Sequence, residues 1–379
     1  MHNTPSSVPP NAPLRVRPAS FSQQRLWFLA QLPGANAAYN ETLASFRIDG
    51  PLDREALLSA FSSLTNRHES LRTRLVAEDG TVNQHIDPPG KGFTLAFEDL
   101  SADADPDERV ARYQRDEAER PFDLEAGPLG RGRLIALGPR RHVLLLTFHH
   151  IIFDGTSMKV MMEEVAAHYT AALTGGEADL PELTVQYADY AQRQREAVLG
   201  GALASQEDFW RRTLDGAPSV LELPTQRPRP AEQRYDGGRV EFALDADVTA
   251  ALRALAHSQQ ASLFNAVLTG WAILLSRLSG QDDIVVGSPV AGRRAPGAAG
   301  LIGFVVNTLP LRVDLSGSPT ATEALARTRA AVRAALAQQD LPFERIVELV
   351  NPPRSASHTP PRPCWPGCRT GTTCCACPG

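Results

Sequence analysis

The chain has 379 residues, a formal net charge of -5 at neutral pH and 42% hydrophobic residues. This length exceeds the size at which one hydrophobic core stops growing, so two subdomains are expected. The negative charge and the absence of any lysine or arginine block argue against nucleic acid as the main partner. The sequence contains no run of about 18 apolar residues and therefore predicts no membrane span. No membrane partner and a cytoplasmic location are expected.

The first 19 residues are rich in proline, serine and asparagine and contain no apolar signal core. This composition is typical of a disordered segment rather than a secretion signal. Residues 1–19 are therefore predicted to be a disordered lead into the first lobe.

Residues 20–180 carry the patterns of a lobe that mixes helices and strands. Apolar residues at helical spacing follow Asp53, a plausible N-cap, and a charged helix is predicted over 106–120 with Asp105 as its N-cap. A short apolar run at 142–148 predicts a central strand, and a helix with an apolar stripe follows it. Shorter strands are predicted at 71–76 and 94–97.

The character of the sequence changes after residue 174, and 181–237 is interpreted as a segment that bridges two lobes. Strands are predicted at 239–244, after residue 282 and around 305–313; helices are predicted at 248–257, 263–278 and 321–336. Residues 238–358 are therefore expected to form a C-terminal lobe. The fold class is predicted as α/β (α+β), with two lobes of similar architecture.

The stretch FHHIIFDGTS places two histidines and an aspartate at the end of the predicted central strand. A metal site is disfavoured because adjacent residues on a strand point to opposite faces, and no G-x-S-x-G supports a serine hydrolase. A purely structural interpretation packs His149 and lets Asp154 cap the next helix. Alternatively, His149 points inward and His150 faces a cleft where its imidazole handles a proton. Asp154 would then pair with an arginine, and Gly155 would permit a tight backbone.

Together with this motif, six further stretches resemble the condensation-domain superfamily of nonribosomal peptide synthetases. H-H-x-x-x-D-G is one signature of that superfamily, and the other stretches follow in the family's order over roughly residues 20 to 360. They are SFSQQRLWFLAQL at 20–32, RHESLRTRL at 67–75, QYADYAQRQRE at 186–196, LIGFVVNTLPLR at 301–312, QQDLPFERIVE at 338–348 and NPPRSASHTP at 351–360.

The resemblance implies two chloramphenicol-acetyltransferase-like lobes arranged as a V around a central tunnel. It also implies amide bond formation between aminoacyl or peptidyl thioesters. Donor and acceptor carrier proteins present these thioesters on phosphopantetheine arms, and an adenylation domain belongs to the same assembly line. No cofactor or metal is expected to bind the domain directly.

The resemblance also assigns site residues. It implies that His150, with His149, Asp154 and Gly155, forms the catalytic motif, and that Asp154 pairs with an arginine of the other lobe. Arg293 is the candidate and its neighbour Arg294 the alternative. Asn307 is expected near the tunnel without a catalytic role.

Two positions depart from the family pattern: Thr156 stands where tryptophan is frequent, and Gln338 or Gln339 where the sixth motif opens with histidine. Epimerization domains keep the histidine motif but need an acidic partner motif that is not seen here. Heterocyclization domains replace the histidine motif with another pattern. The remaining alternative is a condensation-like module that forms no bond and serves as a protein-binding platform.

All five cysteines lie between residues 364 and 377, in the pattern C-x3-C-x5-C-C-x-C, which lacks the C-x2-C pairs of common zinc modules. Residues 359–379 are interpreted as a disordered and out-of-frame tail, because their composition matches a GC-rich gene read in another frame. The second lobe would then be incomplete, which predicts a chain of poor stability when it is expressed alone.

Overall fold

The computed structural model describes residues 14–32, 39–225 and 240–351. The contacts divide the chain into two compact units. Unit 1 contains residues 1–197 and 293–305, and unit 2 contains residues 198–292 and 306–379. The chain therefore leaves unit 2 once, contributes a short segment to unit 1 and returns.

Unit 1 is built on a four-stranded sheet in the order β2-β7-β6-β5. β7 lies in its interior and pairs antiparallel with β2 and β6, whereas β5 pairs parallel with β6. Every residue of β7 after its first is buried, as expected for a strand covered on both faces. The strands are β2 (Asn40–Asp49), β5 (Leu95–Asp99), β6 (Gly130–Gly138) and β7 (Arg141–His149).

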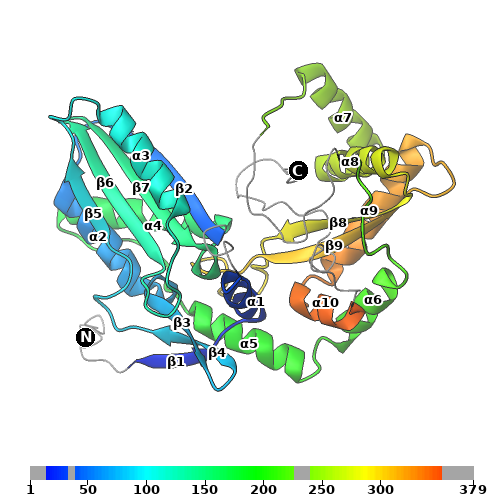
Figure 1. Ribbon diagram of the computed structural model, residues 1–379, viewed down its shortest axis with the longest axis horizontal. Helices are drawn as coiled ribbons and strands as arrows, with labels where there is room; N and C mark the ends of the chain where they lie inside the picture. Colours follow the sequence, from blue (N-terminus) through cyan, green and yellow to red (C-terminus); the bar gives the residue numbers. More distant parts are fainter. Residues whose placement is uncertain (1–13, 33–38, 226–239, 352–379) are drawn as a thin grey trace. The chain divides into compact units, whose positions relative to one another are not determined.

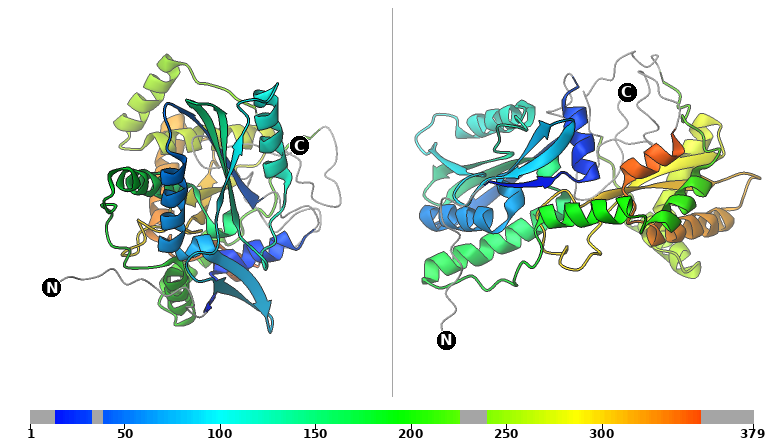
Figure 2. Two further views of the ribbon diagram at one scale, coloured as in Figure 1. Left: turned by 90° about the vertical axis from the view of Figure 1, so that its left-hand side faces the viewer. Right: turned by 90° about the horizontal axis from the view of Figure 1, so that it is seen from below.

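Helices cover both faces of this sheet. Figures 1 and 2 show α3 (Pro106–Glu119) on one face and α2 (Arg54–Arg67) and α4 (Gly155–Thr174) on the other. On the α3 side, Val110 packs with Val143 and Leu145 of β7 in one apolar cluster. The predicted N-caps of α2 and α3 are confirmed, since Asp53 and Asp105 each accept a hydrogen bond from the first turn.

A second, three-stranded sheet of unit 1 corrects the prediction of a disordered lead at residues 15–18. β1 (Arg15–Pro18) pairs antiparallel with β4 (Thr81–Ile86), which also pairs with β3 (Thr73–Glu78). β1 is an edge strand, where a proline that cannot donate a hydrogen bond is tolerated. α1 (Phe21–Ala30) follows, and α5 (Tyr187–Leu199) closes the main part of unit 1.

Unit 2 contains a two-stranded antiparallel sheet of β8 (Asp283–Val290) and β9 (Asn307–Asp314). Leu309, Leu311 and Val313 are buried, so the predicted apolar face of β9 is confirmed for these residues. α9 and β9 are in contact, as are α7 and α8, α8 and α9, and α6 and α10. The helices are α6 (Ala204–Leu214), α7 (Ala246–Ser258), α8 (Leu263–Ser279), α9 (Ala321–Ala337) and α10 (Phe343–Val350).

The strand predicted at 239–244 is wrong over its described residues 240–244, which form no regular element. Val240, Phe242 and Leu244 are 85%, 69% and 53% exposed, so their alternating pattern buries no face. An alternating segment becomes a strand only when another strand satisfies its backbone, and no described strand pairs with it.

The unit boundaries also differ from the predicted lobes. Part of the predicted bridging segment is α6, whose Trp210 is fully buried and donates from its indole nitrogen to the Gln338 carbonyl oxygen within unit 2. Residues 293–305, expected in the C-terminal lobe, belong to unit 1. Residues 1–13 of the predicted lead and the cysteine-rich tail lie outside the described residues.

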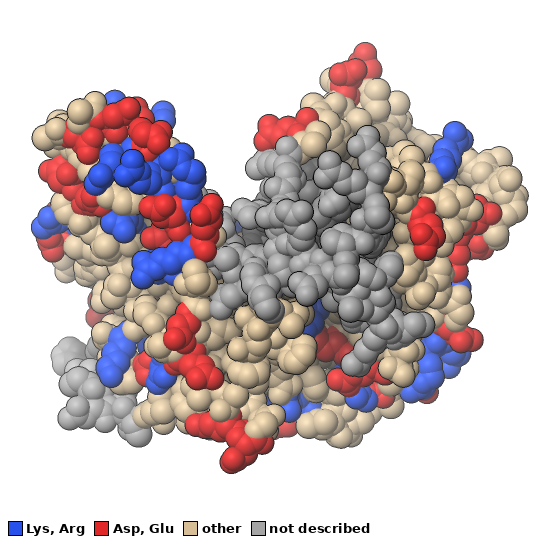
Figure 3. Space-filling view, in the orientation of Figure 1, with Lys and Arg blue, Asp and Glu red and all other residues tan. Residues whose placement is uncertain are grey.

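Acidic and basic side chains are interspersed on the face of unit 1 that Figure 3 displays. Unit 1 contains ion pairs between such side chains, among them Arg133–Glu98 and Arg115–Glu108. Within the described ranges, no single helix is long and apolar enough to cross a membrane; only α7 and α8 taken together, bent by 107°, meet that test.

Candidate functional site

The histidine pair lies where the interior strand of unit 1 ends. β7 ends at His149, and residues His150–Ile152 form a single 3₁₀ turn, labelled η3. The prediction that His149 points inward and His150 does not is borne out by burial, because His149 is fully buried and His150 is half-buried. The reason given was wrong, since His150 is not on the strand and the alternation rule does not apply to it.

His149 is a packed residue with a fixed tautomer. Its Nδ1 accepts a hydrogen bond of 3.1 Å from the Ile151 backbone N–H, so the proton of the neutral ring resides on Nε2. The Phe122 ring meets it edge-on with 6.1 Å between centroids. Burial, and secondarily the neighbouring His150 charge, lowers the pKa of His149 to about 3. His149 is therefore neutral near pH 7.

His150 has the opposite tautomer. Its Nδ1 lies 2.6 Å from the Phe153 carbonyl oxygen, which can only accept, so Nδ1 carries the proton. In the neutral ring the lone pair is then on Nε2. The Phe304 ring packs against the imidazole with 4.5 Å between centroids and an angle of 50° between the planes. This geometry gives unit 1 an oriented imidazole that can accept a proton at one defined atom.

Asp154 caps α4 and is fully engaged by unit 1. Its Oδ1 accepts from the Ser157 backbone N–H at 2.8 Å and from Arg293 Nη2 at 2.7 Å, and the Ser157 hydroxyl lies 2.8 Å away. Its Oδ2 accepts from the Val305 N–H at 3.0 Å. A carboxylate with this many partners holds structure together, and it is not a mobile acid or base.

Arg293 is the arginine that pairs with Asp154, whereas Arg294 is exposed. The Arg293 and Asp154 side chains are only 7% and 3% exposed. Arg293 Nη1 also donates to the carbonyl oxygens of Ala298 and Leu301, at 3.1 and 2.5 Å. The expectation that this arginine comes from the other lobe is corrected, because residues 293–305 belong to unit 1.

Ser157 and Tyr187, which the motifs did not single out, hold this returning segment in place, and Gly303 within the segment allows the close approach. The Ser157 hydroxyl lies 3.0 Å from both the N–H and the carbonyl oxygen of Gly303. The Tyr187 hydroxyl donates to the Phe304 carbonyl oxygen at 2.9 Å. Gly303 lies so close to Tyr187 that an added Cβ would be 2.1 Å from its ring. A glycine between large apolar residues in LIGFVV was the available signal for such a close approach.

The other predicted site residues have structural surroundings. Gly155 is the first residue of α4 and has no left-handed φ, so its backbone conformation does not require glycine. In unit 2, Asn307 Nδ2 donates to the carbonyl oxygens of Gln339 and Leu341, and its Oδ1 accepts from the Phe343 N–H. Asn307 therefore fixes the turn that begins α10.

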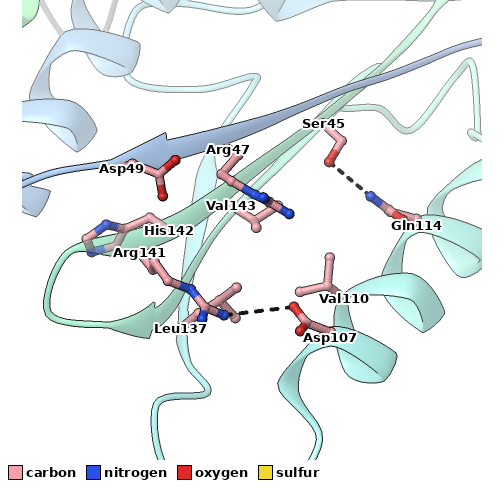
Figure 4. A pocket seen from close by; sticks show the side chains of 10 residues that line it. All are labelled: Ser45, Arg47, Asp49, Asp107, Val110, Gln114, Leu137, Arg141, His142 and Val143. Carbon is pink, nitrogen blue, oxygen red and sulfur yellow. Dashed lines mark hydrogen bonds and ion pairs between the residues drawn. The ribbon is translucent and has the colours of Figure 1, made fainter.

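A cavity of about 660 Å³ in unit 1 is separate from this site. It lies between β2, β7 and α3 (Figure 4), and neither histidine of the motif lines it. Arg141 and Asp107 approach to 3.9 Å across it, and Gln114 donates to Ser45 at 2.9 Å. Arg141 begins β7 and His149 ends it, so the cavity and the histidines are at opposite ends of one strand. Elsewhere in the described part of the chain, no group of three or more His, Cys, Asp or Glu residues is placed to hold a metal ion.

Comparison with known proteins identifies relatives over most of the chain. A family model described as a condensation domain matches residues 14–361. Malpinin synthetase of Mortierella alpina is 47% identical over 343 residues, which are 90% of this chain and 4% of the synthetase. Phosphinothricin tripeptide synthetase PhsC of Streptomyces viridochromogenes is 43% identical over 349 residues, which are 90% of this chain and 32% of PhsC. The chain thus spans a small part of each relative.

Two solved structures illustrate the likeness of fold. The X-domain from teicoplanin biosynthesis has a TM-score of 0.79 at 32% identity, covering 95% of this chain and 77% of the X-domain chain. The first condensation domain of the calcium-dependent antibiotic synthetase, solved with a substrate analogue, has a TM-score of 0.72 at 25% identity. That match covers 88% of this chain and 78% of the other. The predicted α/β fold class is confirmed.

Proposed function

Because the chain belongs to the condensation-domain family of nonribosomal peptide synthetases, we propose that it forms amide bonds between thioester-bound aminoacyl or peptidyl groups. The α-amino group of the acceptor attacks the thioester carbonyl carbon of the donor. The C–N bond forms, the C–S bond breaks, and the donor group is transferred onto the acceptor amine.

The observation that carries this proposal is the fixed tautomer of His150. With Nδ1–H committed to the Phe153 carbonyl oxygen, the lone pair of the neutral ring is on Nε2. Nε2 accepts the proton that the amine nitrogen loses as the tetrahedral intermediate forms, and this proton then goes to the departing sulfur. Such general acid/base help contributes roughly 10² to 10⁴ in rate.

The other motif residues support this imidazole and take no part in proton transfer. His149 stays neutral because burial lowers its pKa to about 3. Asp154 and Arg293 form a buried ion pair at the start of α4, four residues after His150. In this account they keep the loop in shape, and Asn307 has no chemical role.

The substrates are proposed to arrive on phosphopantetheine arms of donor and acceptor carrier proteins, which an adenylation domain loads in the same cytoplasmic assembly line. Tethering two reactants to one enzyme raises their effective concentration, and holding them in a reactive geometry supplies much of the remaining rate. The domain itself needs no bound cofactor for this chemistry.

The test is to add the domain, within its native synthetase module, to loaded donor and acceptor carrier proteins and to analyse the acceptor by mass spectrometry. A dipeptidyl thioester is expected on the acceptor carrier protein. Unchanged carriers after prolonged incubation, together with measurable binding of either carrier, would favour the alternative of a non-catalytic binding platform.

A further inference from the structure

A buried carboxamide from α1 touches the turn that carries His150. Gln23 is fully buried and is the third residue of α1. Its Oε1 accepts from the Ser20 backbone N–H at 3.0 Å, while its own backbone N–H donates to the Ser20 hydroxyl at 3.1 Å. This reciprocal capping box fixes the direction of the Gln23 side chain.

The other end of the same carboxamide binds the η3 turn. Gln23 Nε2 donates to the Ile151 carbonyl oxygen at 3.1 Å. The Ile151 N–H donates in turn to His149 Nδ1 at 3.1 Å. The residue that follows His150 is therefore held on its carbonyl side by α1 and on its N–H side by the buried histidine.

The turn needs such support, because η3 spans only three residues. Its own closing hydrogen bond, from the Phe153 N–H to the His150 carbonyl oxygen, is 3.3 Å long. Isolated 3₁₀ turns have poor hydrogen-bond geometry and are weakly held by themselves. The position of the His150 ring therefore depends on contacts from outside the turn.

We propose that Gln23 is a positioning residue for amide formation, acting through the Ile151 carbonyl to place His150 Nε2. This inference rests on the proposed function of His150. In this proposal the hydrogen bond from Gln23 Nε2 to the Ile151 carbonyl oxygen controls the rate of the chemical step, and capping α1 is only the other role of Gln23.

Gln186 provides a control outside this contact, whereas Gln84 does not, because Gln84 Oε1 lies 3.5 Å from Gln23 Nε2. Gln186 is half-buried in unit 1, its Oε1 accepts from the Glu69 backbone N–H at 3.1 Å and its Nε2 donates to the Arg67 carbonyl oxygen at 3.0 Å. Gln23→Met and Gln186→Met each remove a carboxamide that binds one backbone N–H and one backbone carbonyl oxygen. Gln23→Glu keeps an acceptor for the Ser20 N–H but has no donor for the Ile151 oxygen, so it also tests the proposal if Gln23→Met does not fold.

The first measurement is steady-state amide formation by the native module. Gln23→Met and Gln23→Glu are expected to lower kcat by about 10 to 100-fold, since small displacements of a catalytic group are costly, with little change in KM for the acceptor carrier protein. Gln186→Met is expected to keep the wild-type kcat. Equal kcat in the Gln23 variants and wild type, or equal loss in Gln186→Met, would overturn the proposal.

The second measurement does not depend on activity. Selective ¹⁵N labelling of the histidine rings, with His150→Ala to assign the signals, reports the His150 tautomer and environment. The His150 ring signals are expected to shift in the Gln23 variants and to stay in place in Gln186→Met. If the native module forms no amide but these signals shift, the proposed function fails while the positioning role stands; unmoved signals refute the positioning role itself.

Discussion

At the scale of single residues, the structure separates two adjacent histidines by their tautomers. His149 is protonated on Nε2 and His150 on Nδ1, because their Nδ1 atoms meet a donor and an acceptor respectively. The sequence identified the pair and its unequal burial. It could not predict the tautomers, because these depend on the Ile151 N–H and the Phe153 carbonyl oxygen. These two groups contact the rings only because the strand ends and a 3₁₀ turn follows it.

His149 should make stability depend on pH. The unfolded histidine takes up a proton below about pH 6.5, whereas the buried ring resists protonation until about pH 3. Between these values the unfolded state binds more protons, so the free energy of unfolding falls as pH falls, by up to roughly 1.4 kcal/mol per pH unit. His149→Asn keeps an acceptor for the Ile151 N–H and should lose this contribution. Urea unfolding from pH 7 to pH 4 measures both slopes; parallel curves would contradict the assignment.

The Asp154–Arg293 pair should contribute far more to stability than the exposed pairs of unit 1. Asp154→Asn leaves the buried guanidinium without a counter-charge, which is expected to cost about 3 to 5 kcal/mol in the free energy of unfolding. Glu108→Gln breaks the Arg115–Glu108 pair, whose side chains are more than half exposed, and should change it by no more than about 1 kcal/mol. Comparable losses in the two variants, measured by urea unfolding, would show that the buried pair has no special role.

At the scale of elements, local patterns predicted the helices better than the strands. α8 and α9 lie within a residue of their predicted ends, because apolar periodicity and N-caps are local signals. β4 and β6 were missed: TVNQHI is largely polar, and GRGRLIALG begins with glycines that suggest a loop. Strand identity depends on partners distant in sequence, such as β1 for β4 and β5 for β6. The opposite error at 240–244 has the same cause.

The segment that returns to unit 1 should tolerate a methyl group at one glycine and not at another. An added Cβ at Gly303 would lie 2.1 Å from the Tyr187 ring, whereas at Gly300 the nearest contact is an ordinary 3.7 Å to Leu183. Gly303→Ala should therefore lower the free energy of unfolding by about 1 to 3 kcal/mol, the usual cost of overpacking. Gly300→Ala is the control from the same segment and should be near neutral. Equal effects in thermal unfolding would mean that the close approach of Gly303 is not required.

At the scale of the whole molecule, unit 2 leaves an apolar face of α8 open to solvent. Phe264, Val267, Leu274 and Leu278 recur at helical spacing and are 45–50% exposed. Contiguous exposed apolar surface favours association. The 379-residue chain alone should therefore self-associate at micromolar concentration and bind a hydrophobic dye.

Lysines placed on that face test its role. Val267→Lys with Leu274→Lys should shift the chain toward monomer in sedimentation velocity and reduce dye binding. Ala326→Lys with Ala330→Lys adds the same charge at exposed positions of α9 and serves as the control. If the α9 pair improves behaviour as much as the α8 pair, net charge and not the apolar face is responsible.

The proton-accepting role of His150 is the claim on which the functional account depends. Its most direct test is the single-turnover rate constant for amide formation by the native module, with both carrier proteins loaded, for wild type, His150→Ala and His149→Asn. The account predicts that the rate constant falls roughly 10² to 10⁴-fold in His150→Ala. It predicts a much smaller fall in His149→Asn, because the wild-type His149 imidazole takes no proton from the substrate. A His150→Ala rate equal to that of wild type, or a greater loss in His149→Asn, would contradict it.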